Sequence, residues 1–259
     1  MYYLGIDIGA VTAKAALLSK EGSFFHGLVI PAGYNRKKTA EKLIDQIITE
    51  KQISRDHILS AWATGYGKKA VPFADRTVTE ITCHAAGAHF LLPDTGTIID
   101  IGGQDSKGIR VDPRGRVLDF VMNDKCSAGT GRFLEVMAHA LETDLDFFGN
   151  LADESENPVS ISSTCTVFAE SEVIGHLSAG RAREDIIAGI HLSIAQRIRS
   201  MISSIGINDP VVMTGGVAKN HGMQRALSQV LKINVTVPRE PQLAGALGAA
   251  VLARAGGND

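Results

Sequence analysis

Two eight-residue segments of this chain repeat one pattern, and this repeat limits the possible folds more than any other feature. DIGAVTAK occupies residues 7–14 and DIGGQDSK occupies residues 100–107, and the two align without a gap. In each copy an apolar strand ends at Asp, the chain turns at Gly, and a second strand follows that carries a Lys. A repeated strand-turn-strand unit indicates an internal duplication. We therefore expect two related lobes joined by a short hinge near Pro93.

The predicted elements follow the same order in both halves. In the first half we expect strands at 2–8, 12–19, 23–30 and 57–63 and helices at 38–52 and 80–92. In the second half we expect strands at 96–101, 105–111, 116–121, 210–214 and 233–237, and helices at 130–141, 167–179, 184–204, 219–231 and 241–254. The switching between strand and helix periodicity predicts an α/β fold.

The composition excludes several classes of protein. The chain is 44% hydrophobic and 21% charged, which is typical of a soluble α/β protein. Its 26 Lys and Arg against 28 Asp and Glu give a net charge of −2, so nothing favours nucleic acid or an anionic membrane as a partner. No apolar run approaches the ~20 residues that span a bilayer, and the N-terminus does not resemble a signal peptide. We predict a cytoplasmic protein.

The repeated turns carry groups that could grip a phosphate. An Asp at the end of a strand, followed by Gly, points a carboxylate outward while backbone N–H groups can approach an anion closely. Asp7 and Asp100 could hold a hydrated Mg²⁺ or orient an attacking water, and Lys14 and Lys107 could neutralise phosphate charge. The alternative is that each acid only closes a β-turn.

A third segment, VVMTGGVAKNHGMQRAL at 211–227, combines a buried strand, the turn Thr214-Gly215-Gly216 and a helix. The bare backbone of the two glycines could lie against a flat base or a ribose. Strand-Gly-Gly-helix is also ordinary β/α loop chemistry, so this segment gains weight only from its position after the two repeated turns.

Together these segments resemble the acetate and sugar kinase, heat-shock chaperone and actin superfamily, with 7–14 and 100–107 as phosphate loops and 211–222 as the adenosine loop. The resemblance implies two RNase-H-like lobes, each a βββαβα unit, with an Mg-ATP cleft between them: lobe I from 1–93 and 240–259, and lobe II from 94–239. The residues implied to bind the nucleotide are Gly9, Thr12, Ala13, Lys14, Gly102, Gly103, Ser106, Lys107, Gly215, Gly216, Lys219 and Asn220. The residues implied to hold Mg²⁺ or position water are Asp7, Asp100, Gln104 and Glu80.

Two cysteines stand just before predicted helices. Cys126 lies in NDKCSAGTG and Cys165 lies in SSTCTVFAE. The partial positive charge at a helix N-terminus stabilises a thiolate there. Since an iron–sulfur cluster usually takes four thiolates, a symmetric dimer with two from each chain could share one cluster. The alternative is that Cys126 and Cys165 are small apolar residues buried in the core. We interpret Cys83 in this way.

The segments NDKCSAGTGRFLE at 123–135, STCTVFAESEVI at 163–174 and TGGVAKN at 214–220 are similar to the ATP-dependent activators (component A) of (R)-2-hydroxyacyl-CoA dehydratases, the BadF/BadG/BcrA/BcrD ATPase family. That family includes ATPase subunits of benzoyl-CoA reductase and reductases of double-cubane cluster proteins. The resemblance implies an anaerobic homodimer bridged by one 4Fe–4S cluster on Cys126 and Cys165. It also implies ferredoxin or flavodoxin as the electron donor and an iron–sulfur dehydratase or reductase as the acceptor.

The first loop departs from the relatives, since Ala10, Val11 and Ala13 stand where a hydroxyl residue is frequent. Backbone donors and Thr12 would then carry more of the phosphate binding. Two other functions fit the same scaffold: a kinase for a sugar or carboxylate, and a nucleotide-gated protein-binding module.

Overall fold

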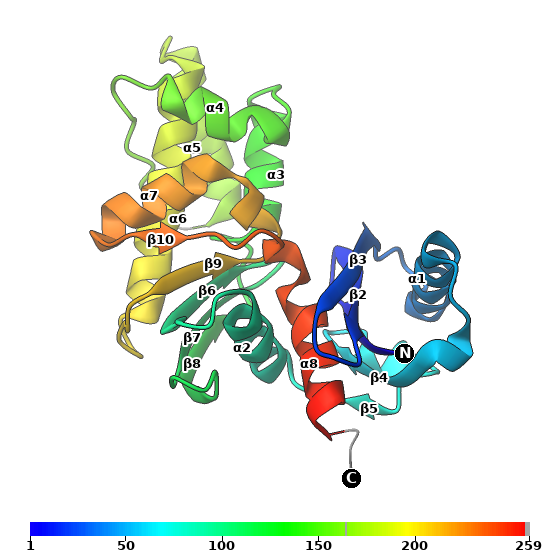
Figure 1. Cartoon of the computed structure of the whole chain (residues 1–259). Coiled ribbons are helices and arrows are strands. Elements are labelled where there is room, and N and C mark those ends of the chain that lie inside the picture. The colour runs from blue at the N-terminus through cyan, green and yellow to red at the C-terminus, as the bar shows by residue number, and fades with distance from the viewer. Residues whose placement is uncertain (164, 257–259) are drawn as a thin grey trace. The chain divides into compact units, whose positions relative to one another are not determined.

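The structure is a computed structural model that describes residues 1–163 and 165–256 (Figure 1). Its contacts divide the chain into two compact units. Unit 1 consists of residues 1–95, 111–118 and the segment from Pro238 onward, and unit 2 consists of residues 96–110 and 119–237. The lobe boundaries given by the resemblance stay a prediction.

Unit 1 is built on one mixed sheet with the strand order β3-β2-β1-β4-β5. Its strands are β1 (Tyr2–Ile8), β2 (Thr12–Ser19), β3 (Phe24–Pro31), β4 (Ile58–Thr64) and β5 (Arg76–Thr77). Its helices are α1 (Arg36–Lys51), α2 (Glu80–Leu91) and α8 (Ala244–Gly256). The strand β1 is antiparallel to β2 and parallel to β4.

The second sheet has the strand order β10-β9-β6-β7-β8. Its strands are β6 (Thr97–Ile101), β7 (Ser106–Val111), β8 (Val117–Asn123), β9 (Val211–Thr214) and β10 (Val235–Thr236). The helices of unit 2 are α3 (Gly131–Ala140), α4 (Phe148–Asp153), α5 (Thr166–Ser178), α6 (Arg183–Ile202) and α7 (His221–Leu231). Here β6 is antiparallel to β7 and parallel to β9.

The two sheets therefore repeat one topology, since β6 to β10 take the places of β1 to β5. This confirms the predicted internal duplication of an α/β unit. The element predictions missed α4 and β5, which are too short to show a periodicity.

Each unit has its own apolar core. In unit 1, one cluster lies under α1 and includes Leu43 and Ile47, and another lies under α8 and includes Trp62 and Leu247. In unit 2, a larger cluster joins the sheet to α3, α6 and α7. None of the helices in the described ranges has the length and apolar character that crossing a membrane would require.

Small residues allow α8 to pack unusually close to α2. A Cβ added at Gly248 would overlap the carbonyl of Cys83, and one added at Gly87 would overlap the carbonyl of Ala244. The backbones of α2 and α8 are therefore in direct contact. Figure 1 shows α8, in red, as the last helix of the chain, and it packs against β1, β2 and β4 of unit 1.

Candidate functional site

The two repeated turns have the same hydrogen bonding. In unit 1 the amide of Gly9 donates to the carbonyl of Thr12 at 3.0 Å, and in unit 2 the amide of Gly102 donates to the carbonyl of Asp105 at 2.9 Å. The strand pairing also matches, because Asp7 lies opposite Lys14 and Asp100 lies opposite Lys107. The sequence repeat is thus a repeat of backbone geometry.

In unit 1, one lysine faces one acid. Lys14 Nζ lies 3.0 Å from Asp7 Oδ2, and the Asp7 side chain is buried. A Cβ at Gly9 would lie 3.2 Å from Lys14 Nζ, so the ammonium group lies beside the turn. This pair is neutral overall.

In unit 2, one lysine faces two acids. Lys107 Nζ lies 2.8 Å from Asp105 Oδ2 and 3.5 Å from Asp100 Oδ2, and its side chain is only 2% exposed. One positive charge among two carboxylates leaves an excess of one negative charge, a setting in which a divalent cation is favoured. The sequence analysis missed Asp105, because Thr12 occupies the same place in the first turn.

A third element repeats as well. Asp7 lies opposite Thr64 on β4, and Asp100 lies opposite Thr214 on β9, in parallel pairing. The next residues, Gly65 and Gly215, have φ angles of 89° and 90°, a region that favours glycine. The carboxylates lie against these glycines, because an added Cβ at either one would crowd an Asp oxygen. The recurring Thr-Gly pair was visible in the sequence and was not used.

The other residues predicted to bind nucleotide lie in different surroundings. Gln104 is exposed at the tip of the second turn, whereas Ser106 is buried. The Ser106 hydroxyl donates to the carbonyl of Gly129 at 2.5 Å, so it stabilises a neighbouring loop. Glu80 is half-buried in the first turn of α2, and Lys219 is exposed.

Asn220 caps α7. Its Oδ1 accepts from the amide of Met223 at 3.1 Å, and its Nδ2 lies 3.0 Å from His191 Nε2. Burial, with a smaller contribution from His221, lowers the pKa of His191 to about 4. His191 is therefore neutral at pH 7 and accepts the hydrogen bond from Asn220. The sequence analysis did not identify His191.

The three cysteines fall into two groups. Cys83 is buried, and desolvation raises its pKa to about 12, as expected for a packing residue. Cys126 and Cys165 are exposed. Cys165 is the N-cap residue of α5, as predicted. Cys126 does not adjoin a helix N-terminus, because α3 begins only at Gly131 and its first amides donate to the second turn; that expectation was wrong.

Both exposed cysteines lie in tightly bonded segments. The residue after each cysteine is bonded to its counterpart, since Ser127 Oγ lies 2.9 Å from Thr166 Oγ1. Asn123 Oδ1 accepts a hydrogen bond from the amide of Cys126 at 3.3 Å, and Asn123 Nδ2 donates one to the carbonyl of Cys126 at 2.8 Å. The two cysteines are thus presented together by one surface of unit 2.

Across the part of the chain that the structure describes, no group of three or more His, Cys, Asp or Glu side chains could hold a metal ion. The chemistry of the Cys126 and Cys165 donors nevertheless suits half of a thiolate site. A complete set would require thiolates from elsewhere.

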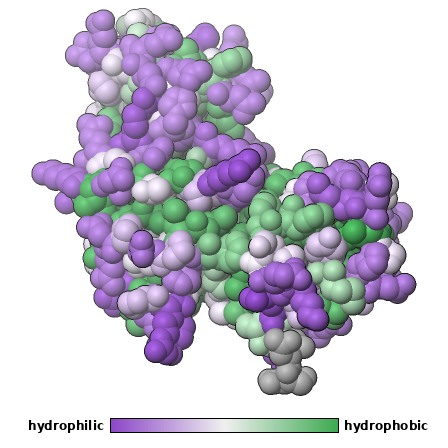
Figure 2. All heavy atoms as spheres, viewed as in Figure 1, coloured by the Kyte–Doolittle hydropathy of each residue, from purple (hydrophilic) through white to green (hydrophobic). Residues whose placement is uncertain are grey.

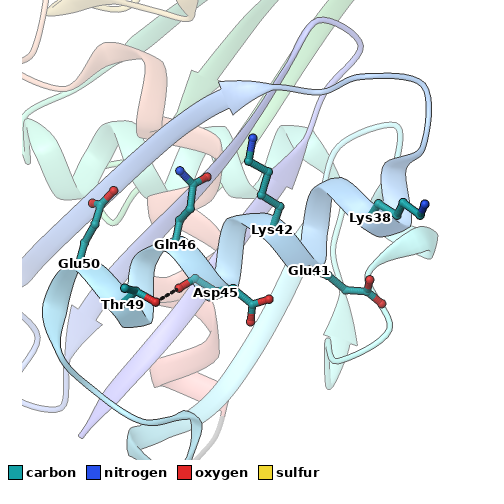
Figure 3. Close-up of a pocket in the computed structure, with 7 residues that line it drawn as sticks. All are labelled: Lys38, Glu41, Lys42, Asp45, Gln46, Thr49 and Glu50. Atoms are coloured by element: carbon teal, nitrogen blue, oxygen red, sulfur yellow. Dashed lines mark hydrogen bonds between the residues drawn. The ribbon is translucent and has the colours of Figure 1, made fainter.

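Polar side chains of α1 line a shallow surface hollow that contains none of the predicted site residues (Figure 3). Its lining residues are Lys38, Glu41, Lys42, Asp45, Gln46, Thr49 and Glu50. Figure 2 shows that hydrophilic residues cover much of this end of unit 1. Charges of both signs alternate along the hollow, so it offers no single ligand chemistry.

Several known proteins are similar to this chain in sequence or in fold. Residues 4–253 match the BadF/BadG/BcrA/BcrD ATPase family. The activator of lactoyl-CoA dehydratase from Anaerotignum propionicum is 48% identical, over 98% of this chain and 97% of that protein. Two solved structures are closely similar. The activator of 2-hydroxyisocaproyl-CoA dehydratase from Clostridium difficile with bound ADPNP has a TM-score of 0.94 at 45% identity and covers 99% of this chain and 96% of its own.

The second solved structure is component A of the (R)-2-hydroxyglutaryl-CoA dehydratase from Acidaminococcus fermentans. It has a TM-score of 0.96 at 42% identity, and the match covers 100% of both chains. A glucokinase of the ROK family from Streptomyces griseus has a TM-score of 0.63 at 12% identity, which shows a shared fold alone.

Proposed function

Because the chain belongs to the BadF/BadG/BcrA/BcrD ATPase family, we propose that it is an ATP-hydrolysing activator that delivers low-potential electrons to a partner iron–sulfur enzyme. The similar proteins named as dehydratase activators support this activity. The observation that carries the electron-transfer part is the placement of Cys126 and Cys165, exposed and joined through the Ser127–Thr166 hydrogen bond.

We assign the phosphates of ATP to the two repeated turns. Backbone amides near Gly9 and Gly102–Gly103 would donate to phosphate oxygens, and Lys14 and Lys107 would balance their charge. Thr12 and the amide of Ala13 would complete the phosphate contacts of the first turn, and Ser106 in the second turn bonds to the neighbouring loop at Gly129. Gly215, Gly216, Lys219 and Asn220 would receive the adenosine.

We assign Mg²⁺ to the acids. The unit 2 turn fits a divalent cation best, because Asp100 and Asp105 together outnumber Lys107. The charge of Asp7 is balanced by Lys14, so we assign Asp7 the role of orienting a water molecule or a hydrated ion. Gln104 is exposed at the second turn and would contact the γ-phosphate or the attacking water, and Glu80 would act through water.

We assign one 4Fe–4S cluster to Cys126 and Cys165 of two chains. Two thiolates from each copy supply the four that such a cluster takes, so a homodimer completes the site. When bound, the cluster would accept and release one electron. In this chain, Cys165 is the N-cap residue of α5, and the loop around Asn123 positions Cys126.

The surface beside Cys165 suits a protein contact. Val167 and Phe168 are 66% and 67% exposed and Ile174 is 49% exposed, so α5 presents apolar side chains to solvent. Exposed apolar groups of this size gather at interaction surfaces. We propose that they pack against the second copy of the chain.

The similar proteins support the kind of acceptor that we propose. A benzoyl-CoA reductase subunit and several dehydratase activators are among them, so we propose a dehydratase or reductase as the acceptor. Ferredoxin or flavodoxin is the proposed donor, and the cytoplasm is the proposed location. The kinase and binding-module alternatives require neither exposed cysteine.

The test is the iron content of anaerobically purified protein. We expect one 4Fe–4S cluster for each two chains, and its loss in Cys126→Ser and Cys165→Ser. Cys83→Ala is the matched control, because Cys83 is buried, and it should keep its iron. Equal iron in all three variants would exclude the assigned ligands, and ATP hydrolysis without any iron would leave only an ATPase.

A further inference from the structure

The second turn is bonded directly to the first turn of α3. The amide of Gly131 donates to the carbonyl of Gly102 at 2.9 Å, and the amide of Arg132 donates to the carbonyl of Gly103 at 2.8 Å. The first amides of a helix have no partner within the helix and usually bind a cap, water or an anion. Here they hold the turn, so a displacement of the turn displaces the start of α3.

A buried side chain adds a third bond between the same segments. Ser106 is 1% exposed, and its hydroxyl donates to the carbonyl of Gly129 at 2.5 Å. Gly129 has a φ of 89°, and an added Cβ would lie 3.0 Å from Arg197 Cδ. The Gly129 backbone is therefore bonded to Ser106 on one side and lies close to the Arg197 side chain on the other.

The path continues from α3 to Cys126. Thr130, the N-cap residue of α3, is fully buried, and its hydroxyl donates to the carbonyl of Ser127 at 2.6 Å. Its amide also donates to the Ser127 carbonyl, at 3.1 Å. Ser127 directly follows Cys126, so the second turn and Cys126 are connected through a series of hydrogen bonds that are buried or partly buried.

One more bond reaches Cys165. Ser127 Oγ and Thr166 Oγ1 lie 2.9 Å apart, and Thr166 is the first residue of α5, directly after Cys165. These hydrogen bonds define one order along the path. The second turn comes first, Cys126 lies in the middle, and Cys165 lies at the end.

We propose that the segment Ser127–Arg132 transmits the nucleotide state of the second turn first to Cys126 and then to Cys165, with Ser106, Thr130 and Thr166 as positioning residues. This proposal rests on the function proposed above, since it assumes that the turn binds phosphate. Spatial connection alone does not establish coupling, so the order of the path is what an experiment must test.

The experiment measures alkylation of the thiols by iodoacetamide in full-length, cluster-free protein under anaerobic conditions. Mass spectrometry gives the rate at Cys126 and at Cys165 separately, with no nucleotide, with saturating Mg-ADP and with a saturating non-hydrolysable ATP analogue. Calorimetry gives the nucleotide Kd of each variant, so that each is assayed at saturation. The buried Cys83 serves as an internal marker of unfolding.

In the unaltered protein, we expect the alkylation rates with Mg-ADP and with the ATP analogue to differ by roughly fivefold at both cysteines. This factor corresponds to the free energy of about one neutral hydrogen bond, which we expect to be made in one nucleotide state and lost in the other. Ser106→Ala and Thr130→Val should reduce this difference to less than about twofold at both cysteines. Thr166→Val, which keeps the shape of the side chain, should remove the difference at Cys165 and keep it at Cys126. Thr166→Ser should restore it.

The matched control is Ser178→Ala, at the other end of α5, where the hydroxyl donates to the carbonyl of Ile174 at 2.9 Å. It should respond like the unaltered protein. A full nucleotide response at Cys165 in Thr166→Val, or at both cysteines in Thr130→Val, would overturn the proposed path. A protein that binds nucleotide with no change at either thiol would overturn the coupling and leave the ATPase assignment intact, whereas a failure to bind nucleotide would remove both.

Discussion

Thr214 donates a hydrogen bond of 2.8 Å from its hydroxyl to Asp100 Oδ1, across the parallel pairing of β9 and β6. Its counterpart in the other repeat, Thr64, lies opposite Asp7 but donates to the carbonyl of Val78 at 3.1 Å. The two halves therefore share a backbone and differ in how the acid is held. Asp100 is oriented by a hydroxyl as well as by Lys107, so the acid of the second turn is held by more side chains than these two contacts give Asp7 in the first turn.

We predict that Thr214→Val lowers the ATPase kcat roughly tenfold while the nucleotide Kd changes less. A buried hydrogen bond to a charged group contributes about 1.5–3 kcal/mol, and its loss lets the Asp100 carboxylate rotate away from the position it needs. Steady-state kinetics and calorimetry measure the two constants. Thr64→Val is the matched control and should keep its kcat, because Asp7 retains Lys14. Equal losses in both variants would show that the hydroxyl at Thr214 has no special role.

The sequence predicted the fold well where periodicity was strong and failed where segments were short. The helix expected at 184–204 is α6 at Arg183–Ile202, and its long apolar stripe explains this agreement. The helix α4, six residues long at Phe148–Asp153, has too few turns to show a stripe. The first three strands were predicted because Gly and polar residues separate them clearly.

The candidate site was predictable only as far as the repeat preserved it. Asp, Gly and Lys recur in both turns, and the repeat therefore singled them out as candidate site residues. Asp105 is aligned with Thr12, so the repeat gave no reason to select it. The neighbourhood of Cys126 and Cys165 could not be predicted, because Ser127 and Thr166 are 39 residues apart and meet only through the packing of α3 and α5.

We predict that His191 makes the stability of unit 2 depend on pH. Burial lowers its pKa to about 4 in the folded chain, so between pH 6.5 and 4 the unfolded chain binds a proton there and the folded chain does not. Stability is therefore lost as the pH falls through this window. From pH 7 to pH 5 the loss from this residue is about 2 kcal/mol.

Urea unfolding at the two pH values tests this, with circular dichroism for the whole chain and fluorescence of Trp62 marking unit 1. His191→Gln keeps an acceptor for Asn220 and should shrink the difference between the two pH values. His139→Gln, at an exposed position of α3, is the control and should leave the difference unchanged. The prediction is wrong if His191→Gln and the unaltered chain lose the same stability.

We predict that Glu172→Gln loosens the segment before Cys165. The Glu172 carboxylate accepts from the amide and hydroxyl of Ser162 and from the amide of Ser163, at 2.9, 3.0 and 2.9 Å. Burial alone would raise its pKa, but these hydrogen bonds prevail and lower it to about 2. The contribution of the Glu172 carboxylate to stability is therefore fully present above pH 4.5 and is lost as the pH falls towards 2.

Hydrogen exchange at pH 7 measures this loosening. The amides of Ser162 and Ser163 should exchange roughly tenfold faster in Glu172→Gln, because bonds to a charged acceptor are the stronger ones. Glu170→Gln is the matched control on the same helix, since its carboxylate is not the acceptor for these amides. Unchanged exchange in Glu172→Gln would show that other contacts hold the segment.

We predict that Gly248→Ala strongly destabilises unit 1. A Cβ at Gly248 would overlap the Cys83 carbonyl in α2, and backbone atoms on both sides leave no flexible side chain that could move aside. Overpacking of this kind costs about 1–3 kcal/mol, more than the gain of about 1 kcal/mol that Ala brings to a helix interior. Trp62 belongs to the same apolar cluster as α8 and is the one tryptophan of the chain, so its fluorescence reports thermal unfolding of this unit directly.

Gly175→Ala is the matched control, because it also lies within a helix and an added Cβ would meet nothing within 4 Å. It should raise or preserve stability, whereas an unfolding midpoint for Gly248→Ala equal to that of the unaltered chain would mean that α8 packs less closely on α2 than the structure shows.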